Sequence, residues 1–336
     1  MSTMQTRRRF LRTLSLAGTA GLFRPSPSAA DDERLETTSV RFFKNAVICV
    51  APQYAAEALL RAEGFTDVSY VDVQPADEVP KAIADGRVDF TMSFAVNHIQ
   101  TIDRGAPITI LGGVHIGCYE LFAREEVRAI RDLKGKTVAI QYVGGGDQVL
   151  LSSMLAYIGI NPQREVTWIA GESATDAMDL FVAGKADAFL GYAQQPEELR
   201  LKQVGHVIVD TAQDRPWSQY FCCMVAANRD FVQRHPIATK HVLSAILKAT
   251  DICAADPQGA ARFLSDKLYE PRFQIGLNVM QRLPYNFWRE ADPEDTLRFH
   301  ALRLHEVGLI QTSPNKLIAN PTDWRFLNEL KREMKT

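Results

Sequence analysis

Short apolar runs alternate with amphipathic stretches along most of the chain. The runs 40–43, 68–73 and 107–111 predict buried strands. Between the first two runs, Ala55 and Leu59 belong to a helical pattern whose apolar residues share one face. Strand and helix therefore follow each other in turn, which predicts a parallel sheet with helices on both of its faces.

The same order of elements begins again further along the chain. Strand and helix pairs are predicted within 137–158 and 165–182. The segments Gly86-Arg-Val-Asp-Phe and Gly184-Lys-Ala-Asp-Ala-Phe occupy equivalent places, since each ends a helix with a glycine and restarts a strand after an acid. This internal repeat predicts two similar α/β lobes, each doubly wound.

Two further apolar runs, near residues 119–124 and 221–226, are predicted to cross between the lobes. The second lobe is then an insertion in the first: lobe 1 comprises 36–122 and 222–336, and lobe 2 comprises 123–221. The C-terminal part is mostly helical and is predicted to pack on lobe 1. Ligands of open α/β sheets bind beyond the carboxyl ends of the strands, so we expect a cleft between the lobes.

Three consecutive glycines stand between a predicted strand and a predicted helix of the second lobe. Gly144, Gly145, Gly146 and Asp147 place a flexible loop at a helix N-terminus, where backbone N–H groups favour a polar or anionic guest. A dinucleotide-binding fingerprint would need a glycine at Val149, and the phosphate loop of NTPases would need a Gly-Lys-Ser/Thr ending. We interpret the loop as half of a ligand cleft; a tight turn alone is the alternative.

Asp147 has two interpretations that the sequence leaves open. An ionised carboxylate is favourable at a helix N-terminus without any ligand, so Asp147 either caps the helix or contacts the ligand. If it faces the cleft, its charge disfavours a fully anionic ligand such as nitrate or sulfate. A ligand with a hydrogen-bond donor or an aromatic ring is then favoured.

Other polar residues follow predicted strands and are candidate ligand contacts, because site chemistry concentrates in such loops. Ser93 and Asn97 either cap a helix or meet the ligand, and Lys44 is either a contact or a solvated strand end. The complete predicted ligand-binding set is Lys44, Asn45, Ser93, Asn97, Gly144, Gly145, Gly146, Asp147, Gln148, Tyr192, Gln195 and Glu197.

Charge and composition exclude some classes of protein. The 336 residues are 46% hydrophobic and 23% charged, as in soluble globular proteins. The formal net charge is −2, but residues 1–30 hold five arginines and no acid, so the remainder has 33 basic and 40 acidic residues. An acidic body without a basic stripe argues against a nucleic-acid partner.

Residues 1–30 resemble a twin-arginine export signal. Arg7, Arg8 and Arg9 precede Phe10 and a short apolar stretch, and small residues end the segment where the composition changes abruptly. The apolar stretch is too short to span a bilayer, so we expect no direct membrane insertion once the signal is cleaved. This predicts export to the periplasm; a basic amphipathic arm is the alternative.

The cysteines and histidines show no metal-binding spacing. Five cysteines, at 49, 118, 222, 223 and 253, form no short motif, and their odd number argues against a complete disulfide framework. We interpret them as buried thiols that act as small hydrophobic residues. No nucleophile elbow, metal triad or supported pair of carboxylates is present. The sequence therefore predicts no metal, no cofactor and no catalytic residue, and a protein that is not an enzyme.

Several segments together resemble one family of transport proteins. These are Gly86-Arg-Val-Asp-Phe, Asp132-Leu-Lys-Gly-Lys-Thr-Val-Ala-Ile, the glycine loop with a helix ending in Ile158-Gly-Ile-Asn-Pro, and Gly184-Lys-Ala-Asp-Ala. In this order and spacing they resemble the substrate-binding proteins of nitrate, sulfonate and taurine type ABC importers. The same superfamily includes proteins that bind or synthesise the pyrimidine precursor of thiamine.

The resemblance implies a type II periplasmic binding protein fold, with two doubly wound lobes and an interlobe cleft. It also implies a protein that closes on a small organic ligand, either a sulfonate, a carboxylate or a heteroaromatic compound. The ligand would then be delivered to the membrane subunits of an ABC permease. An exported enzyme and a ligand-presenting sensor protein are the alternatives on the same fold.

Overall fold

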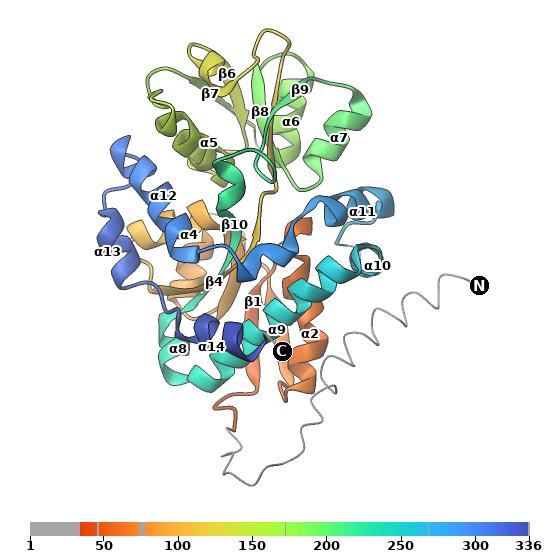
Figure 1. The fold of residues 1–336 in the computed structure, drawn as a ribbon, viewed down its shortest axis with the longest axis vertical. Coiled ribbons are helices and arrows are strands. Elements are labelled where there is room, and N and C mark those ends of the chain that lie inside the picture. Colours follow the sequence, from red (N-terminus) through yellow and green to blue (C-terminus); the bar gives the residue numbers. More distant parts are fainter. Residues whose placement is uncertain (1–33, 46, 74–77, 172, 268, 335–336) are drawn as a thin grey trace, which may run out of the picture.

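The computed structural model describes residues 34–45, 47–73, 78–171, 173–267 and 269–334. The predicted export signal at 1–30 therefore lies outside the described residues. Two five-stranded sheets, each covered by helices, make up the described part, with the second sheet at the top of Figure 1.

The first sheet has the strand order β2-β1-β3-β10-β4. Its strands are β1 (Ser39–Phe43), β2 (Asp67–Val71), β3 (Phe90–Phe94), β4 (Ile108–Ile116) and β10 (Phe221–Asn228). The second sheet has the order β7-β6-β8-β5-β9. Its strands are β5 (Tyr119–Ala123), β6 (Thr137–Ile140), β7 (Thr167–Ala170), β8 (Ala188–Tyr192) and β9 (His206–Asp210).

The sequence predicted parallel sheets, but both sheets are mixed. β1 runs parallel to β2 and β3, but β10 runs antiparallel to β3 and β4. In the second sheet β5 runs antiparallel to β8 and β9 in the same relative place. The antiparallel strand of each sheet is the one that has just crossed from the other half, so it enters its sheet from the cleft side. The predicted crossings near residues 119 and 221 are these two strands.

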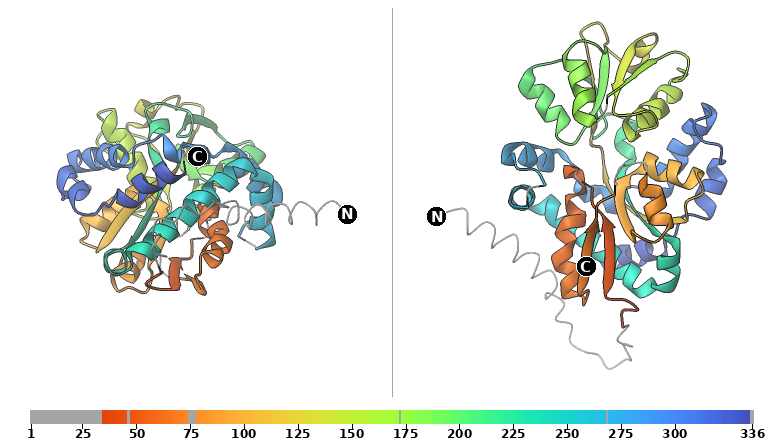
Figure 2. Two further views of the ribbon diagram at one scale, coloured as in Figure 1. Left: turned by 60° about the horizontal axis from the view of Figure 1, so that its bottom comes forward. Right: turned by 180° about the vertical axis from the view of Figure 1, so that it is seen from behind.

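The crossing strand β5 belongs to the second sheet, although the predicted boundary between the lobes lies after residue 122. The exact limits of the two lobes stay a prediction. Seen from behind, two connections join the halves, the short segment from β4 to β5 and the segment with the 3₁₀ turn at Trp217–Gln219 that enters β10 (Figure 2).

Helices cover both sheets. Those between the strands are α2 (Ala51–Ala62), α3 (Val79–Ala84), α4 (Ala95–Asp103), α5 (Gly146–Tyr157), α6 (Ala174–Val182) and α7 (Gln195–Lys202). Short 3₁₀ turns occur at η1 (Ile48–Val50), η3 (Ile130–Leu133), η4 (Trp217–Gln219) and η5 (Tyr285–Arg289). The segment after β10 is helical: α8 (Arg229–Arg234), α9 (Pro236–Ala255), α10 (Pro257–Asp266), α11 (Phe273–Arg282), α12 (Pro293–Glu306), α13 (Pro314–Ala319) and α14 (Arg325–Glu333).

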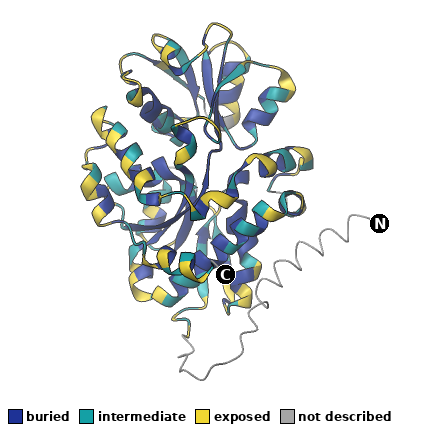
Figure 3. Ribbon diagram, viewed as in Figure 1, coloured by how far each residue is buried: buried dark blue, intermediate teal, exposed yellow. Residues whose placement is uncertain are grey.

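The helix α9 shows how the C-terminal segment joins the core of the first half. It begins at Pro236, which is favourable in a first helical turn because the missing N–H has no helical partner there. Its buried face, with Val242, Leu243 and Ile246, packs between β4 and α2. Buried residues follow the sheets and the inner helix faces, and exposed residues follow the rim (Figure 3). The predicted packing of the C-terminal helices on the first half is thereby explained.

The repeated Gly-x-x-Asp segments have one structural role in both halves. Oδ2 of Asp89 accepts a hydrogen bond from the backbone N–H of Arg41 at 2.8 Å, and Oδ2 of Asp187 accepts one from Thr137 at 2.8 Å. The backbone N–H of each aspartate donates in return to the carbonyl of the same partner, also at 2.8 Å. Each aspartate directly precedes its own strand, β3 or β8, and therefore ties the start of that strand to the neighbouring parallel strand, which explains why the acid recurs at the same spacing after the glycine.

We expect Asp187→Ala to lower the free energy of unfolding by about 1–3 kcal/mol, because the N–H of Thr137 loses its acceptor at the start of β6. Urea unfolding followed by circular dichroism measures the change. Asp179→Ala is the matched control, since Asp179 faces solvent and its ion pair with Lys202 spans 3.7 Å. The control should change stability by less than about 0.5 kcal/mol. Equal effects of the two substitutions would contradict the strand-start role.

Candidate functional site

A cleft with a volume of about 750 Å³ lies between the two halves. The first half contributes the carboxyl ends of β1 and β3 and the first turns of α4, and the second half contributes the loop after β6 and the end of β8. Residues on the lining include Asn45, Ser93, Phe94, Asn97, Arg104, Tyr119, Gln141, Gly144, Gly146, Asp147, Ser173 and Tyr192. The site therefore lies where open α/β sheets bind ligands.

The glycine loop forms the second-half wall of this cleft. Gly144 has φ +82°, a conformation that side-chain-bearing residues rarely adopt. Gly146 begins α5 so close to α4 that an added Cβ would lie 2.5 Å from Oδ1 of Asn97. A Cβ on Gly145 would lie 2.8 Å from Oδ1 of Asp147. The triple glycine thus serves both a turn and a close approach between the two halves.

Asp147 is a buried carboxylate at this wall, only 3% exposed. It is the second residue of α5, whose N-cap is Gly145 and has no side-chain cap. Oδ2 accepts a hydrogen bond from the N–H of Gln141 at 2.9 Å, which ties the end of β6 to the helix. Oδ1 has no hydrogen-bond partner among the described residues. Burial raises the pKa of Asp147 to about 6, although backbone N–H groups, foremost that of Gln141, oppose the rise.

Three aromatic rings lie together beside this wall. The ring centroid of Phe94 is 4.9 Å from that of Tyr119 and 5.3 Å from that of Tyr192, and the two tyrosine rings are 5.4 Å apart. The Tyr192 hydroxyl accepts a hydrogen bond from Nε2 of Gln141 at 2.6 Å. The Tyr119 hydroxyl has no partner within the described part of the chain. Burial raises the pKa of both tyrosines, so both hydroxyls stay protonated and can donate.

The structure brings seven of the predicted site residues together on the cleft lining. They are Asn45, Ser93, Asn97, Gly144, Gly146, Asp147 and Tyr192. Nδ2 of Asn97 lies 3.4 Å from the Ser93 hydroxyl, so these two form a polar pair on the first-half wall. The other five predicted residues, Lys44, Gly145, Gln148, Gln195 and Glu197, are not on the lining.

Two of those five shape the loops that carry the lining. Oε1 of Gln148 accepts a hydrogen bond from the N–H of Gly144 at 2.6 Å, which closes the glycine loop. Oε1 of Gln195 accepts one from the N–H of Tyr192 at 3.1 Å and so fixes the end of β8. Both glutamines position cleft residues through the backbone.

Glu197 and Lys44 take part in ion pairs away from the cleft lining. Glu197 lies 2.8 Å from Arg200 and 3.4 Å from Arg282, so it joins α7 to α11. Lys44 lies 3.6 Å from Asp72 at the exposed ends of β1 and β2.

The sequence reasoning did not place Phe94, Arg104 or Gln141 in the site. Gln141 was assigned to the end of a strand and Phe94 to the turn that opens the next helix, and neither side chain was singled out as a ligand contact. Tyr119, at the start of the crossing strand β5, also lies on the lining. His98 is buried, and its Nε2 lies 3.0 Å from the carbonyl oxygen of Met224.

One group of side chains with the spacing of metal ligands lies outside the cleft lining. Within the described ranges, one group of cysteine and histidine side chains, Cys49, His115 and Cys223, is close enough to hold one ion. Among the described residues, no helix is both long enough and apolar enough to cross a membrane.

The two sheets, their crossing strands and the cleft between them define a two-lobed binding-protein fold. The chain superposes with a TM-score of 0.75 and 14% identity on the periplasmic nitrate-binding protein NrtA from Synechocystis PCC 6803, with 90% of each chain covered. It superposes with a TM-score of 0.68 and 18% identity on a putative periplasmic sulfonate-binding protein, SsuA, from Methylobacillus flagellatus KT, covering 90% of this chain and 96% of that one. The predicted α/β periplasmic binding protein fold is confirmed.

The sequence profile of the NMT1/THI5 like family matches residues 51–260. The chain belongs to this family. It is also 24% identical over 248 residues to a 4-amino-5-hydroxymethyl-2-methylpyrimidine phosphate synthase from Candida albicans (strain WO-1). That alignment covers 68% of this chain and 71% of the fungal protein.

This relative contradicts the prediction that the protein is not an enzyme. A synthase is among its sequence relatives, so the lack of a familiar catalytic motif was not a sufficient reason to exclude catalysis. The motifs that were searched belong to hydrolases and metalloenzymes. Chemistry on a ligand held in an interlobe cleft need not use any of them.

The raised pKa of Asp147 predicts a pH-dependent stability that one substitution removes. Because the folded pKa of about 6 exceeds the ordinary value near 4, the native state binds the proton more readily, and stability falls as pH rises through this window. Asp147→Asn keeps an acceptor for Gln141 and cannot ionise. We expect it to be more stable than wild type at pH 7, by on the order of 2 kcal/mol, and similar at pH 4.

Urea unfolding of both proteins at pH 4, 5, 6 and 7 measures this difference. Asp179→Asn, at an exposed position on α6, is the control and should follow the wild-type pH profile. A stability difference between Asp147→Asn and wild type that stays constant over the whole range would contradict a buried, titrating carboxylate.

Proposed function

We propose that the protein binds a small heteroaromatic compound with hydrogen-bond donors, of the aminopyrimidine class, in the cleft between its two halves. From the periplasm it delivers this ligand to the membrane subunits of an ABC permease. The observation that carries the proposal is the buried carboxylate of Asp147 beside the rings of Phe94, Tyr119 and Tyr192. Oδ1 of this carboxylate has no hydrogen-bond partner among the described residues.

An aminopyrimidine matches both parts of this arrangement. Its flat ring can pack against the aromatic side chains, and its amino group can donate to Oδ1 of Asp147. The name of the Candida albicans relative supports the same chemical class, because its product is an aminopyrimidine. A bare anion such as nitrate fits less well, because it has no proton to donate to the carboxylate of Asp147.

Arg104 gives the cleft a place for an anionic substituent. It supplies the only guanidinium or ammonium group on the described lining, and its Nη2 lies 3.9 Å from where a Cβ on Gly144 would be. The first turn of α5, which has no side-chain cap, adds N–H groups nearby. A phosphate ester of the pyrimidine would therefore place its ring at the buried wall and its charge at the rim.

Binding in this cleft requires closure of the two halves. The volume of about 750 Å³ exceeds that of a single pyrimidine, so the walls must approach to exclude water. Closure strengthens the hydrogen bonds to Asp147 and Tyr192 because it removes water from around them. A ligand that binds the closed form better shifts an existing equilibrium toward it.

Calorimetry tests the ligand class with four compounds: 4-amino-5-hydroxymethyl-2-methylpyrimidine, its phosphate ester, taurine and nitrate. We expect binding of one or both pyrimidines. Asp147→Asn should weaken that binding roughly 10- to 100-fold, because one charge-assisted hydrogen bond is lost. Asp179→Asn should bind as wild type does. Binding of taurine or nitrate alone, or unchanged affinity in Asp147→Asn, would contradict the proposal.

Chemistry on the bound pyrimidine is the second candidate, because a synthase is among the relatives. Mass spectrometry of the ligand after incubation with the protein separates the two roles. Recovery of unaltered ligand, together with uptake of labelled pyrimidine that depends on the gene, supports delivery to a permease. A changed product formed in more than one equivalent supports catalysis.

A further inference from the structure

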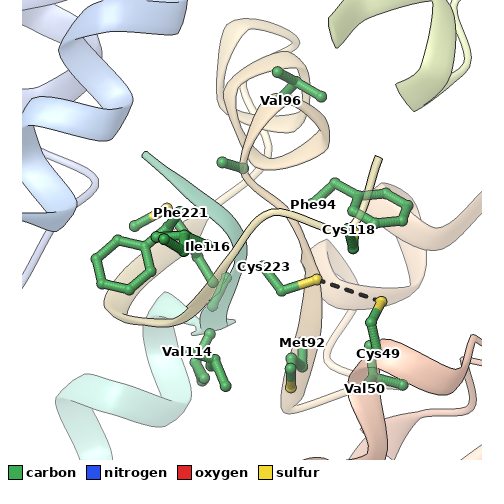
Figure 4. Close-up of a cluster of buried hydrophobic side chains, with 14 of the residues drawn as sticks. Cys49, Val50, Met92, Phe94, Val96, Val114, Ile116, Cys118, Phe221 and Cys223 are labelled. Atoms are coloured by element: carbon green, nitrogen blue, oxygen red, sulfur yellow. Dashed lines mark hydrogen bonds between the residues drawn. The ribbon is translucent and has the colours of Figure 1, made fainter. Parts of the chain in front are cut away.

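Four of the five cysteines gather beneath the cleft, where the chain crosses between the two halves. Cys49 is in η1, Cys118 lies between β4 and β5, and Cys222 and Cys223 begin β10. Figure 4 shows Cys49 and Cys223 pointing toward each other, with Cys118 close by. The thiols of Cys118 and Cys222 interact with this pair. Segments up to 174 residues apart thus place their thiols together.

Two of these thiols and one imidazole form a group with the geometry of a metal site. Sγ of Cys49 lies 3.8 Å from Sγ of Cys223. One nitrogen of His115 joins them, and the three ligand atoms lie within 4.8 Å of one another. All three side chains have no exposed surface.

The hydrogen bonds of His115 leave one ring nitrogen free to bind a metal. Its Nδ1 lies 3.1 Å from the carbonyl oxygens of both Ile116 and Gly117, and since carbonyls only accept, Nδ1 carries the proton. Nε2 then holds the lone pair, and it has no hydrogen-bond partner among the described residues. A metal-ligating histidine is typically oriented by such a bond from its other nitrogen to a backbone carbonyl.

We propose that Cys49, His115 and Cys223 form a binding site for a soft d¹⁰ cation, Zn²⁺ or Cu⁺. Two sulfurs bound tetrahedrally at about 2.3 Å from one zinc are about 3.8 Å apart, which is the spacing found here. A disulfide would require about 2 Å between them. Thiolate and imidazole are the ligands that these two cations prefer.

Charge balance favours Zn²⁺ of the two cations. When a divalent ion binds, each of the two thiols gives its proton to solvent, so two negative thiolates offset two positive charges. The resulting site with neutral His115 carries no net charge, which suits a position without solvent contact. Cu⁺ in the same ligands would leave one uncompensated negative charge.

The site lies beside both the cleft and the place where the chain crosses between the two halves. Cys223 stands opposite Phe94 in the β3–β10 ladder, and Phe94 is on the cleft lining. The Tyr285 hydroxyl donates to the carbonyl of Cys49 at 3.0 Å, and its ring lies 5.1 Å from that of His115. A metal here would hold η1, β4 and β10 together beneath the ligand. The site is independent of the proposed pyrimidine binding.

Metal binding by the full chain, after reduction and treatment with a chelator, tests the proposal. One arm titrates Zn²⁺ against a chromophoric chelator, and a second, anaerobic arm does the same with Cu⁺. We expect one equivalent to bind, with Zn²⁺ favoured. Co²⁺ in place of Zn²⁺ should produce a near-ultraviolet band from sulfur-to-cobalt charge transfer.

Cys49→Ala and Cys223→Ala should each weaken metal binding by more than about 100-fold. Substitution of a residue that only contacts a metal ligand costs up to about 100-fold, and loss of a ligand itself should cost more. Alanine keeps these positions small and apolar, and circular dichroism checks the fold. Cys253→Ala is the matched control, because Cys253 is equally buried but lies in α9 outside the group.

Several results would overturn the proposal. They are the absence of binding in both arms, a Co²⁺ spectrum without the sulfur band, and binding by folded Cys223→Ala equal to that of wild type. If either cysteine variant fails to fold, His115→Gln decides the question, and unchanged affinity in that variant would also overturn it. None of these measurements uses the pyrimidine ligand, so their failure is distinct from failure of the proposed function.

Discussion

The close approach of α5 to α4 is the constraint on which the cleft depends. The first turn of α5 comes so near Asn97 that a Cβ at position 146 would lie 2.5 Å from its Oδ1, and the Asn97 side chain would have to move. The preceding turn needs the positive φ of Gly144. These two requirements bring the end of β6 and the start of α5 against the other half, where the buried carboxylate of Asp147 lines the cleft. A side chain at either glycine would move the wall and its carboxylate together.

The wall is organised around buried acceptors that have few partners. Asp147 uses one oxygen to hold the N–H of Gln141, whose side chain in turn donates to Tyr192. The second carboxylate oxygen and the Tyr119 hydroxyl have no partner among the described residues. Leaving buried polar groups unpaired costs free energy, so such groups commonly mark a position where a ligand completes the hydrogen bonding.

The architecture was predictable because its signals are local. The Gly86–Asp89 and Gly184–Asp187 segments recur since each encodes a helix end and a strand start within four residues, and Asp89 and Asp187 make the same pair of hydrogen bonds. The mixed strand directions were not predictable from periodicity, because an antiparallel strand shows the same alternation as a parallel one.

The site was predictable only in part, for a related reason. Polar residues after strands, such as Asn97 and Asp147, have a loop signal, and the structure places them on the lining. In the aromatic group, Tyr119 pairs with Tyr192 across β5 and β8, and Phe94 joins them from the other sheet, which no short spacing encodes. The same holds for Cys49 and Cys223, whose thiols meet only in the folded chain.

A crystal structure of the protein with 4-amino-5-hydroxymethyl-2-methylpyrimidine tests the central claim most directly. The account predicts the pyrimidine ring against Tyr119 and Tyr192, with its amino nitrogen within hydrogen-bonding distance, about 3 Å, of Oδ1 of Asp147. A ligand bound elsewhere, or a ring held in the cleft with its amino group turned away from Asp147, would contradict it.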